Sequence, residues 1–180
     1  IDKKQTDIAM KLIEVSPDQL NVVDKNGRTP LHLAIKKKQT DIAMKLIELL
    51  KELPNQINVK DKGGDTPLYF AIIMKQEDIA LKLIEHLQSS PDQLSVQNVE
   101  KSTPLHFAIE NEQINVAMKL IENLQESPDQ LNVADDEGST PLHVAILMKQ
   151  EDIALKLIEH LQSSPDQLNV VDKYGSTPLH

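Results

Sequence analysis

The chain has 180 residues, of which 39% are hydrophobic and 26% charged, a composition typical of a folded protein rather than a disordered one. The formal charge of −9 argues against nucleic acid as a partner, because an acidic surface repels a phosphate backbone. Cysteine is absent, which excludes disulfides and thiolate metal sites, and no apolar run approaches the roughly 20 residues that span a bilayer.

The chain starts inside a repeated unit, because residues 1–14 return almost letter for letter at residues 35–48. We expect a partial repeat at 1–23, full repeats at 24–60, 61–97, 98–134 and 135–171, and the start of a truncated repeat at 172–180. Both ends fall within repeats, which suggests a fragment of a longer array. A fixed period of this length indicates one stacked solenoid.

Each full repeat is predicted to begin with a tight turn that needs a residue with positive φ. In four of the five turns this residue is glycine: Gly27, Gly64, Gly138 and Gly175. The turn of repeat 98–134 carries Lys101 instead. Either this lysine adopts positive φ at an energetic cost or the turn changes shape, and we expect a locally distorted turn.

A short helix follows each turn and starts with Thr-Pro-Leu-His or a close variant. The starting threonines lie 37 residues apart: Thr29, Thr66, Thr103, Thr140 and Thr177. Threonine can cap a free backbone N–H, and proline suits the first helical position because its missing donor would be unpaired there. Leu31, Leu33 and Ala34 are predicted to face inward.

A second, amphipathic helix completes the pair and needs a neighbour to cover it. In residues 41–50 the apolar residues at helical spacing are Ile42, Leu46, Ile47 and Leu50. A Ser-Pro-Asp-Gln-Leu segment, as at residues 90–94, then reads as a capping box and predicts one short helical turn with its leucine inward. Phosphorylation at Ser-Pro is the alternative interpretation of the same residues.

The Thr-Pro-Leu-His phrase resembles the helix start of ankyrin repeats, whose period of about 33 residues is close to the one here. The resemblance implies an all-α, ankyrin-like solenoid of stacked helix-turn-helix repeats with hairpin-like turns. The period is about four residues longer than the family's, which predicts a second helix longer by about one turn, roughly 5.4 Å. The family's glycine after the first helix is absent, which leaves the geometry of that turn open. The residues in its place are Lys38, Lys75, Glu112 and Lys149.

Histidines recur at the repeat spacing as a ladder: His32, His106, His143 and His180. Metal ligands lie about 2.0–2.1 Å from a zinc ion, whereas packed helices lie about 8–10 Å apart, so different rungs cannot share one ion. A hydrogen bond between neighbouring turns explains the ladder better, and Tyr69 in one rung shows that imidazole is not required. We expect no metal and no cofactor. With no nucleophile–base pair or glycine-rich phosphate loop in the sequence, we expect no enzymatic activity either.

The resemblance further implies that two positions near the end of each first helix line an inner groove and bind partners together with the turn tips. The groove candidates are Lys36, Lys37, Ile73, Met74, Glu110, Asn111, Leu147 and Met148. The turn-tip candidates are Lys25, Arg28, Lys62, Asp65, Asp136, Glu137 and Tyr174. Two of the four groove pairs are apolar, and exposed apolar patches mark contact sites. The alternative is that Ile73 and Leu147 pack under the neighbouring repeat.

The predicted function is a non-enzymatic module that binds a protein or an extended peptide, acting as a monomer in the cytoplasm. Residues 71–96 match residues 145–170 at all but two positions, which places two similar apolar sites about 20 Å apart around a polar repeat. One alternative is the targeting array of a larger enzyme, for instance a microbial effector in host cytosol. A structural spacer is a third possibility, favoured if Met74 and Met148 are buried.

Overall fold

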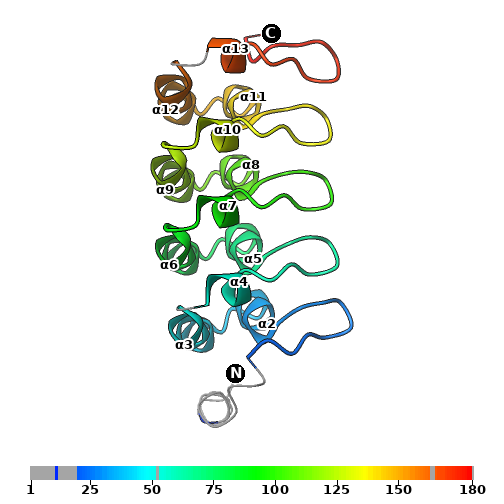
Figure 1. Ribbon diagram of the computed structural model, residues 1–180, viewed down its shortest axis with the longest axis vertical. Coiled ribbons are helices and arrows are strands. Elements are labelled where there is room, and N and C mark those ends of the chain that lie inside the picture. Colours follow the sequence, from blue (N-terminus) through cyan, green and yellow to red (C-terminus); the bar gives the residue numbers. More distant parts are fainter. Residues whose placement is uncertain (1–10, 12–19, 52, 163–164, 180) are drawn as a thin grey trace.

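The computed structural model describes residues 11, 20–51, 53–162 and 165–179, and every regular element in this part of the chain is a helix. Most of the partial repeat expected at 1–23 lies outside the described residues, as does His180. The described helices form four successive groups of three, and the groups stack along one axis with a projecting turn beside each (Figure 1). The chain is therefore an all-α solenoid, as the repeat pattern predicts.

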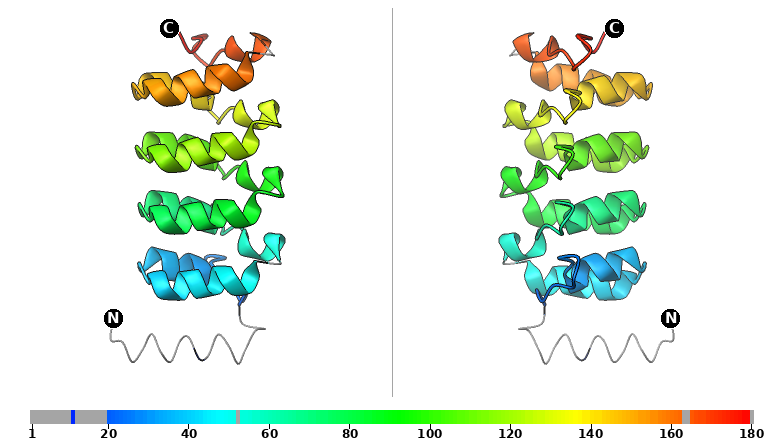
Figure 2. Two further views of the ribbon diagram at one scale, coloured as in Figure 1. Left: turned by 90° about the vertical axis from the view of Figure 1, so that its left-hand side faces the viewer. Right: turned by 90° about the vertical axis from the view of Figure 1, so that its right-hand side faces the viewer.

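The helices of a group occupy separate columns of the stack, and the side views show successive groups lying parallel (Figures 1 and 2). The inner helices lie nearest the turns: α2 (Pro30–Lys36), α5 (Pro67–Ile73), α8 (Pro104–Glu110) and α11 (Pro141–Leu147). The outer helices lie farther from the turns: α3 (Thr40–Leu50), α6 (Glu77–Leu87), α9 (Ile114–Leu124) and α12 (Glu151–Leu161). The short helices follow them: α4 (Pro54–Ile57), α7 (Pro91–Leu94), α10 (Pro128–Leu131) and α13 (Pro165–Leu168).

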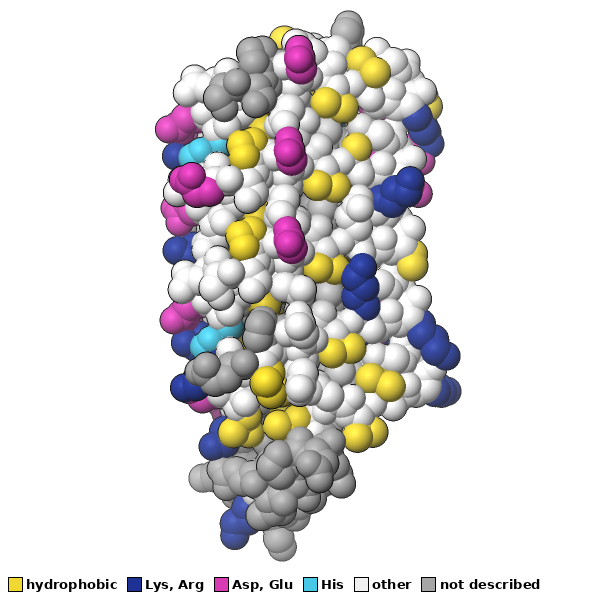
Figure 3. All heavy atoms as spheres, viewed as in Figure 1, with side chains coloured by type: hydrophobic (Ala, Val, Ile, Leu, Met, Phe, Trp, Pro, Cys, Tyr) yellow, Lys and Arg dark blue, Asp and Glu magenta, His cyan; other side chains and the backbone are white. Residues whose placement is uncertain are grey.

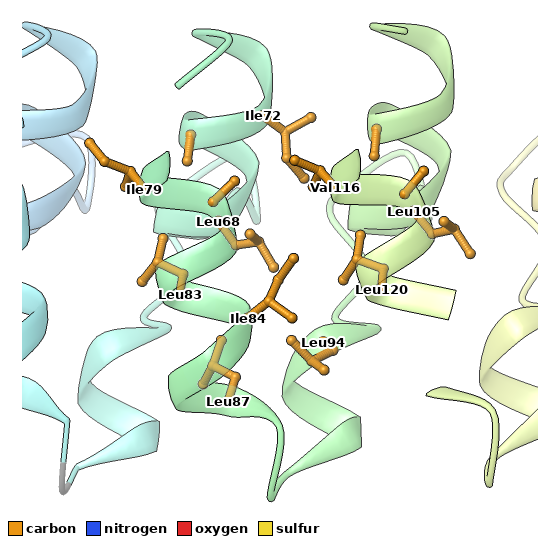
Figure 4. Close-up of a cluster of buried hydrophobic side chains, with 14 of the residues drawn as sticks. Leu68, Ile72, Ile79, Leu83, Ile84, Leu87, Leu94, Leu105, Val116 and Leu120 are labelled. Carbon is orange, nitrogen blue, oxygen red and sulfur yellow. The ribbon is translucent and has the colours of Figure 1, made fainter. Parts of the chain in front are cut away.

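Apolar side chains from all three columns form one continuous core between neighbouring groups (Figure 4). Leu68 of α5 and Leu83 and Ile84 of α6 are fully buried in it. Burying a side chain of this size contributes about 1.5–3 kcal/mol. The four residues predicted to form the apolar face of α3 are all buried as well: Ile42, Leu46, Ile47 and Leu50. Because no group covers these faces alone, stacking is what stabilises the fold.

A Thr-His pair begins three of the inner helices and also joins neighbouring repeats. In α8, Nδ1 of His106 accepts the backbone N–H of Thr103 at 3.2 Å and lies 2.8 Å from the Thr103 Oγ1. Since Nδ1 is an acceptor, Nε2 carries the proton and donates to the Ser139 carbonyl in the next turn at 3.0 Å. His32 and His143 make equivalent contacts. The predicted structural role of the ladder is confirmed for these three histidines.

Tyr69 takes the histidine position in α5 and keeps only half of this arrangement. Its hydroxyl donates to the Ser102 carbonyl, which is the equivalent acceptor in the next turn. The phenol offers no acceptor beside the helix start, and the Thr66 Oγ1 is left buried without a partner. The contact between repeats is therefore preserved while the helix cap is lost.

Acid should destabilise the array through the buried histidines. Burial lowers the pKa of both His32 and His106 below the ordinary value of 6.5. Below about pH 6.5 the unfolded chain therefore binds more protons than the folded one, and the free energy of unfolding falls as the pH falls, by at most about 1.4 kcal/mol per unit for each histidine. We expect the urea midpoint to decrease between pH 7 and pH 5. His106→Gln keeps an N3 capping side chain but does not titrate, so it should reduce this slope; an unchanged slope would contradict the assignment.

Each inner helix ends in a Schellman motif whose left-handed residue is not glycine. After α5, the Lys75 N–H donates to the Ile72 carbonyl at 3.0 Å and the Gln76 N–H to the Ala71 carbonyl at 2.9 Å, while Lys75 has φ = 54°. The other three inner helices end in the same way, with these left-handed residues: Lys38, Glu112 and Lys149. Residues with side chains thus adopt the conformation that glycine usually supplies there.

Replacing these four left-handed residues by glycine should stabilise the array. An L-residue in this conformation costs about 1–2 kcal/mol, and the greater freedom of glycine in the unfolded chain returns about 0.5–1 kcal/mol of that. The expected net gain in unfolding free energy is about 0.5–1 kcal/mol per site, adding to about 2–4 kcal/mol because the sites are far apart. The control is Lys37→Gly, where φ is −88° and glycine should destabilise. A less stable fourfold variant in urea unfolding would refute this account.

The projecting turns are joined to one another by backbone hydrogen bonds. The Val99 N–H donates to the Gly63 carbonyl at 3.0 Å, and the Asp136 N–H donates to the Glu100 carbonyl at 3.0 Å. The turns at residues 62 and 173 make the same kind of bond to the turn before them. One backbone bond of this kind therefore links each described turn to the next.

The expectation of a distorted turn at Lys101 is wrong. Lys101 has φ = 58° and its N–H donates to the Asn98 carbonyl at 3.1 Å, as the glycine N–H does in the other turns. The Asn98 Oδ1 also accepts the N–H groups of Glu100 and Ser102, in the way that aspartate does elsewhere. Because bonds within the turn and to both neighbouring turns fix the backbone, the lysine adopts the strained φ and the turn keeps its shape.

The Ser-Pro-Asp-Gln-Leu segments form the short helices, and Leu94 in α7 is fully buried as predicted. The predicted capping box is wrong, because Ser90 has φ = −135° and ψ = 74° and its side chain caps no N–H. The glutamine of the segment instead contacts the preceding repeat. Gln130 donates to the Asp92 carboxylate, and its Oε1 accepts the Ser95 hydroxyl at 2.9 Å. The motif therefore joins repeats rather than closing its own turn.

A second row of glutamines, which the sequence analysis missed, also joins the repeats. At the start of α6, Gln76 Nε2 donates to the Ile35 carbonyl of the preceding inner helix at 2.6 Å. Gln150 makes the same bond to Ile109 at 2.6 Å. The signal was present in the sequence, because the four glutamines recur at the 37-residue period: Gln39, Gln76, Gln113 and Gln150.

Candidate functional site

The eight groove candidates lie at the C-terminal ends of the four inner helices, two in each repeat. The first of each pair is the last helical residue and the second is the cap, with φ between −91° and −80°. Because the inner helices stack in one column, the pairs form a row whose character runs basic, apolar, acidic, apolar from α2 to α11. We call this row the inner-helix edge: Lys36, Lys37, Ile73, Met74, Glu110, Asn111, Leu147 and Met148.

The apolar members of the inner-helix edge are accessible to solvent. Ile73 is 39% exposed, Leu147 78% and Met148 36%, while Met74 is half-buried. Ile73 and Leu147 therefore do not pack under a neighbouring repeat. Leu147 is the more exposed of the two because α8 covers one side of α5, whereas among the described residues no inner helix follows α11. Leu147 borders an open hollow of about 360 Å³ beside the last turn.

The polar members of the inner-helix edge differ in exposure and in hydrogen bonding. Lys36, Lys37 and Glu110 are exposed. Asn111 is half-buried, and its Nδ2 donates to the Phe107 carbonyl of its own helix at 2.9 Å. Glu110 is therefore the charged and exposed member of the acidic pair.

The charged groups near Glu110 are carboxylates. Partial burial raises the pKa of Glu110, and the nearby carboxylates of Asp135 and Glu100 raise it further. Burial also raises the pKa of Asp65, which the Asn98 amide at 3.3 Å partly opposes. The charged neighbours that act on Glu110 are thus acidic, and a cation placed beside it would be stabilised.

Four of the seven turn-tip candidates contact adjacent turns through their side chains. Arg28 Nε lies 3.3 Å from the Asp61 carboxylate, and its guanidinium lies over the Phe70 ring at 5.4 Å from the centroid. Asp65 accepts the Asn98 amide, and Glu137 pairs with Lys173 of the next turn. These side chains support the stack. Tyr174 is exposed as well, and its hydroxyl donates to the Glu137 carboxylate at 3.4 Å. The remaining three candidates are exposed at the tips: Lys25, Lys62 and Asp136.

The face that carries the short helices shows a different pattern. Acidic side chains recur there in a column at α7, α10 and α13, among scattered apolar spots (Figure 3). The first two of these acids are bonded to the next repeat, since Gln130 donates to Asp92 and Gln167 donates to Asp129 at 2.5 Å. This column therefore joins repeats, and it does not present the paired apolar residues of the inner-helix edge.

The described residues offer no arrangement for metal chemistry. Within this part of the chain no cluster of three histidine, cysteine, aspartate or glutamate side chains could hold a metal ion. Each described histidine of the ladder bonds its own threonine and a backbone carbonyl instead. No helix among the described residues has the length and hydropathy to cross a membrane.

Comparison with known proteins agrees with this architecture. The sequence model of the family described as "Ankyrin repeats (3 copies)" matches residues 1–95 and 82–168. The chain belongs to the ankyrin repeat family. The crystal structure of EF0377, an ankyrin repeat protein, is similar to this ankyrin array with a TM-score of 0.72 and 26% sequence identity, over 98% of this chain and 85% of that one. No curated protein matches the array in sequence.

Ankyrin repeats generally mediate protein–protein interactions and are generally non-catalytic. For the array described above, this general role agrees with a surface that offers exposed apolar side chains. The family alone specifies neither the partner nor the contact residues.

Proposed function

We propose that this ankyrin array is a non-enzymatic module that binds a protein or an extended peptide along the inner-helix edge, with the exposed turn tips contributing. The observation that supports this is the exposure of apolar pairs at the equivalent ends of α5 and α11. Each pair places two neighbouring apolar residues on the surface. Exposed apolar groups of this kind mark contact sites, and methionine adapts its shape to a partner. An edge that served only solubility would be polar in all four repeats.

The two apolar pairs favour a partner that reaches both. They belong to segments that are nearly identical in sequence and lie two repeats apart. If each repeat advances by about one helix spacing, the pairs are about 20 Å apart, with the polar pair of α8 between them. A structural spacer without a partner is disfavoured, because Met148 is exposed and Met74 is only half-buried.

The same surface would serve an independent adaptor or the targeting array of a larger enzyme. In both cases the array holds the partner and performs no chemistry. The absence of cysteine fits a reducing compartment, and we propose that the array acts as a monomer in the cytoplasm.

The test is to select binders from a displayed library of random peptides and to map one bound peptide on the array by hydrogen exchange. We expect protection at the ends of α5 and α11 together, because a peptide that touches both apolar pairs shields both. Three results would overturn the proposal: no peptide that binds, protection confined to one repeat, or protection of the outer helices alone.

A further inference from the structure

We propose that the inner-helix edge selects an extended peptide in which a basic residue lies between two apolar residues, about three residues from each. This inference rests on the proposed function and specifies the chemistry of its partner. The apolar residues of the peptide would contact the pairs at the ends of α5 and α11, and the basic residue would meet Glu110 between them.

The charge around Glu110 supports the basic residue. Glu110 is an exposed residue at the end of α8 with a partly buried carboxylate, and the charged groups that act on it, Asp135 and Glu100, are both acidic. The residue after this pair is also acidic, Glu112, where the other three repeats carry lysine. A lysine or arginine from a partner would relieve this repulsion, whereas a carboxylate would increase it.

The spacing of the peptide follows from the geometry of stacked repeats. Neighbouring helices pack about 10 Å apart, and an extended chain advances about 3.3 Å per residue. One repeat therefore corresponds to about three peptide residues, and the two apolar contacts to about six.

The edge also assigns an order to the peptide side chains along the array. Lys36 and Lys37 lie one repeat beyond the apolar pair of α5, and no equivalent basic pair lies beside α11 among the described residues. An acidic residue about three positions outside the first apolar residue would meet these lysines. The complementary order is therefore acidic, apolar, basic, apolar, which differs from its own reverse.

The experiment measures the affinity of four synthetic fluorescent peptides by anisotropy at low and high salt. The first has the spacing Glu-x-x-Leu-x-x-Lys-x-x-Leu, with serine at x, and the second carries glutamate in place of the central lysine. The third and fourth are the first two with serine in place of the outer glutamate. The proteins are the wild-type array, Glu110→Lys and Glu110→Gln. Because Glu110 is exposed, both substitutions should leave the thermal midpoint nearly unchanged.

We expect the wild type to bind the lysine peptide at least 10-fold more tightly than the glutamate peptide, with the ratio shrinking at high salt. Glu110→Lys should invert the ratio and Glu110→Gln should bring it close to one. Equal binding of both peptides by the wild type would overturn the inference while leaving the proposed function intact if library peptides bind. Absence of any binding, by these peptides and by the library, would overturn both. Equal binding of the first and third peptides by the wild type would overturn the assigned order, because the outer acidic residue would then gain nothing from Lys36 and Lys37.

Discussion

The double variant Met74→Glu/Met148→Glu should lose at least 100-fold in affinity for a selected peptide while its thermal midpoint stays within about 3 °C of the wild type. Full burial of an exposed methionine contributes about 1.5–3 kcal/mol, so a partner that covers these partly exposed side chains gains a fraction of that from each. Each glutamate carboxylate would in addition lose its hydration at the same contact, and a tenfold change in affinity corresponds to about 1.4 kcal/mol. Stability should be preserved because Met148 is 36% exposed and Met74 is half-buried at a helix cap. The measurements are peptide anisotropy and thermal unfolding.

The matched control for this variant is Gln88→Glu/Gln162→Glu. These glutamines are exposed C-cap residues of α6 and α12, so the control adds the same two charges to the same two repeats on the outer helices. We expect its affinity to change by less than about threefold, as is usual for charges remote from an interface. A large fall in thermal midpoint for the methionine variant would instead show that these side chains stabilise the fold.

His106→Ala should lower the unfolding free energy by about 3–5 kcal/mol. The substitution leaves the Thr103 N–H, the Thr103 hydroxyl and the Ser139 carbonyl without their partner in a site where His106 is fully buried. Each buried polar group that loses its hydrogen bond costs about 1–3 kcal/mol, and the removed ring leaves a cavity as well. Urea unfolding measures the total loss.

His143→Ala is the matched control, because His143 makes the equivalent contacts but is only half-buried. Water can reach the exposed groups there, so we expect a loss of about half that of His106→Ala. Native-state hydrogen exchange should show the His106→Ala loss first in the helices on either side of this contact, since each repeat touches only its neighbours. Equal losses at both positions would contradict the role of burial.

The sequence predicted the parts of the fold that repeat and depend on local chemistry. The Thr-Pro start placed the inner helices, and the apolar spacing identified the buried face of α3. The left-handed backbone of Lys75 was not predicted, and that of Lys101 was only one of two alternatives, because a lysine gives no local signal for positive φ. Hydrogen bonds from the rest of the helix end and from adjacent turns impose it, and these are set by the stack.

The capping box predicted for the Ser-Pro segment was wrong for a related reason. The capping box is a pattern of one helix end, and it assumes that Gln93 and its equivalents bond within their own turn. In the array these glutamines lie at an interface, where Gln130 finds Asp92 and Ser95 of the preceding repeat. A period of 37 residues shows that such side chains are aligned, but the bond that each one makes depends on the packing of the repeats.

The positions of the candidate site could be predicted only through the resemblance to ankyrin repeats. The positions at the ends of the inner helices were identified, but their exposure was not, since Ile73 and Leu147 differ twofold although their sequence surroundings are nearly identical. The difference in exposure arises because α8 packs on the following side of α5, whereas no described inner helix packs on that side of α11. The involvement of Arg28 and Glu137 with adjacent turns likewise depends on contacts between repeats.

The ladder of turns has a mechanical consequence. A single backbone bond joins one tip to the next, as from Val99 to Gly63 at 3.0 Å, whereas the helices meet through layers of fully buried aliphatic side chains. Aliphatic layers resist separation far more strongly than the few polar contacts between tips, such as this bond and the Asn98–Asp65 contact at 3.3 Å. The tip side is therefore the compliant side of the stack, and we expect bending about the helical columns to change the curvature of the array.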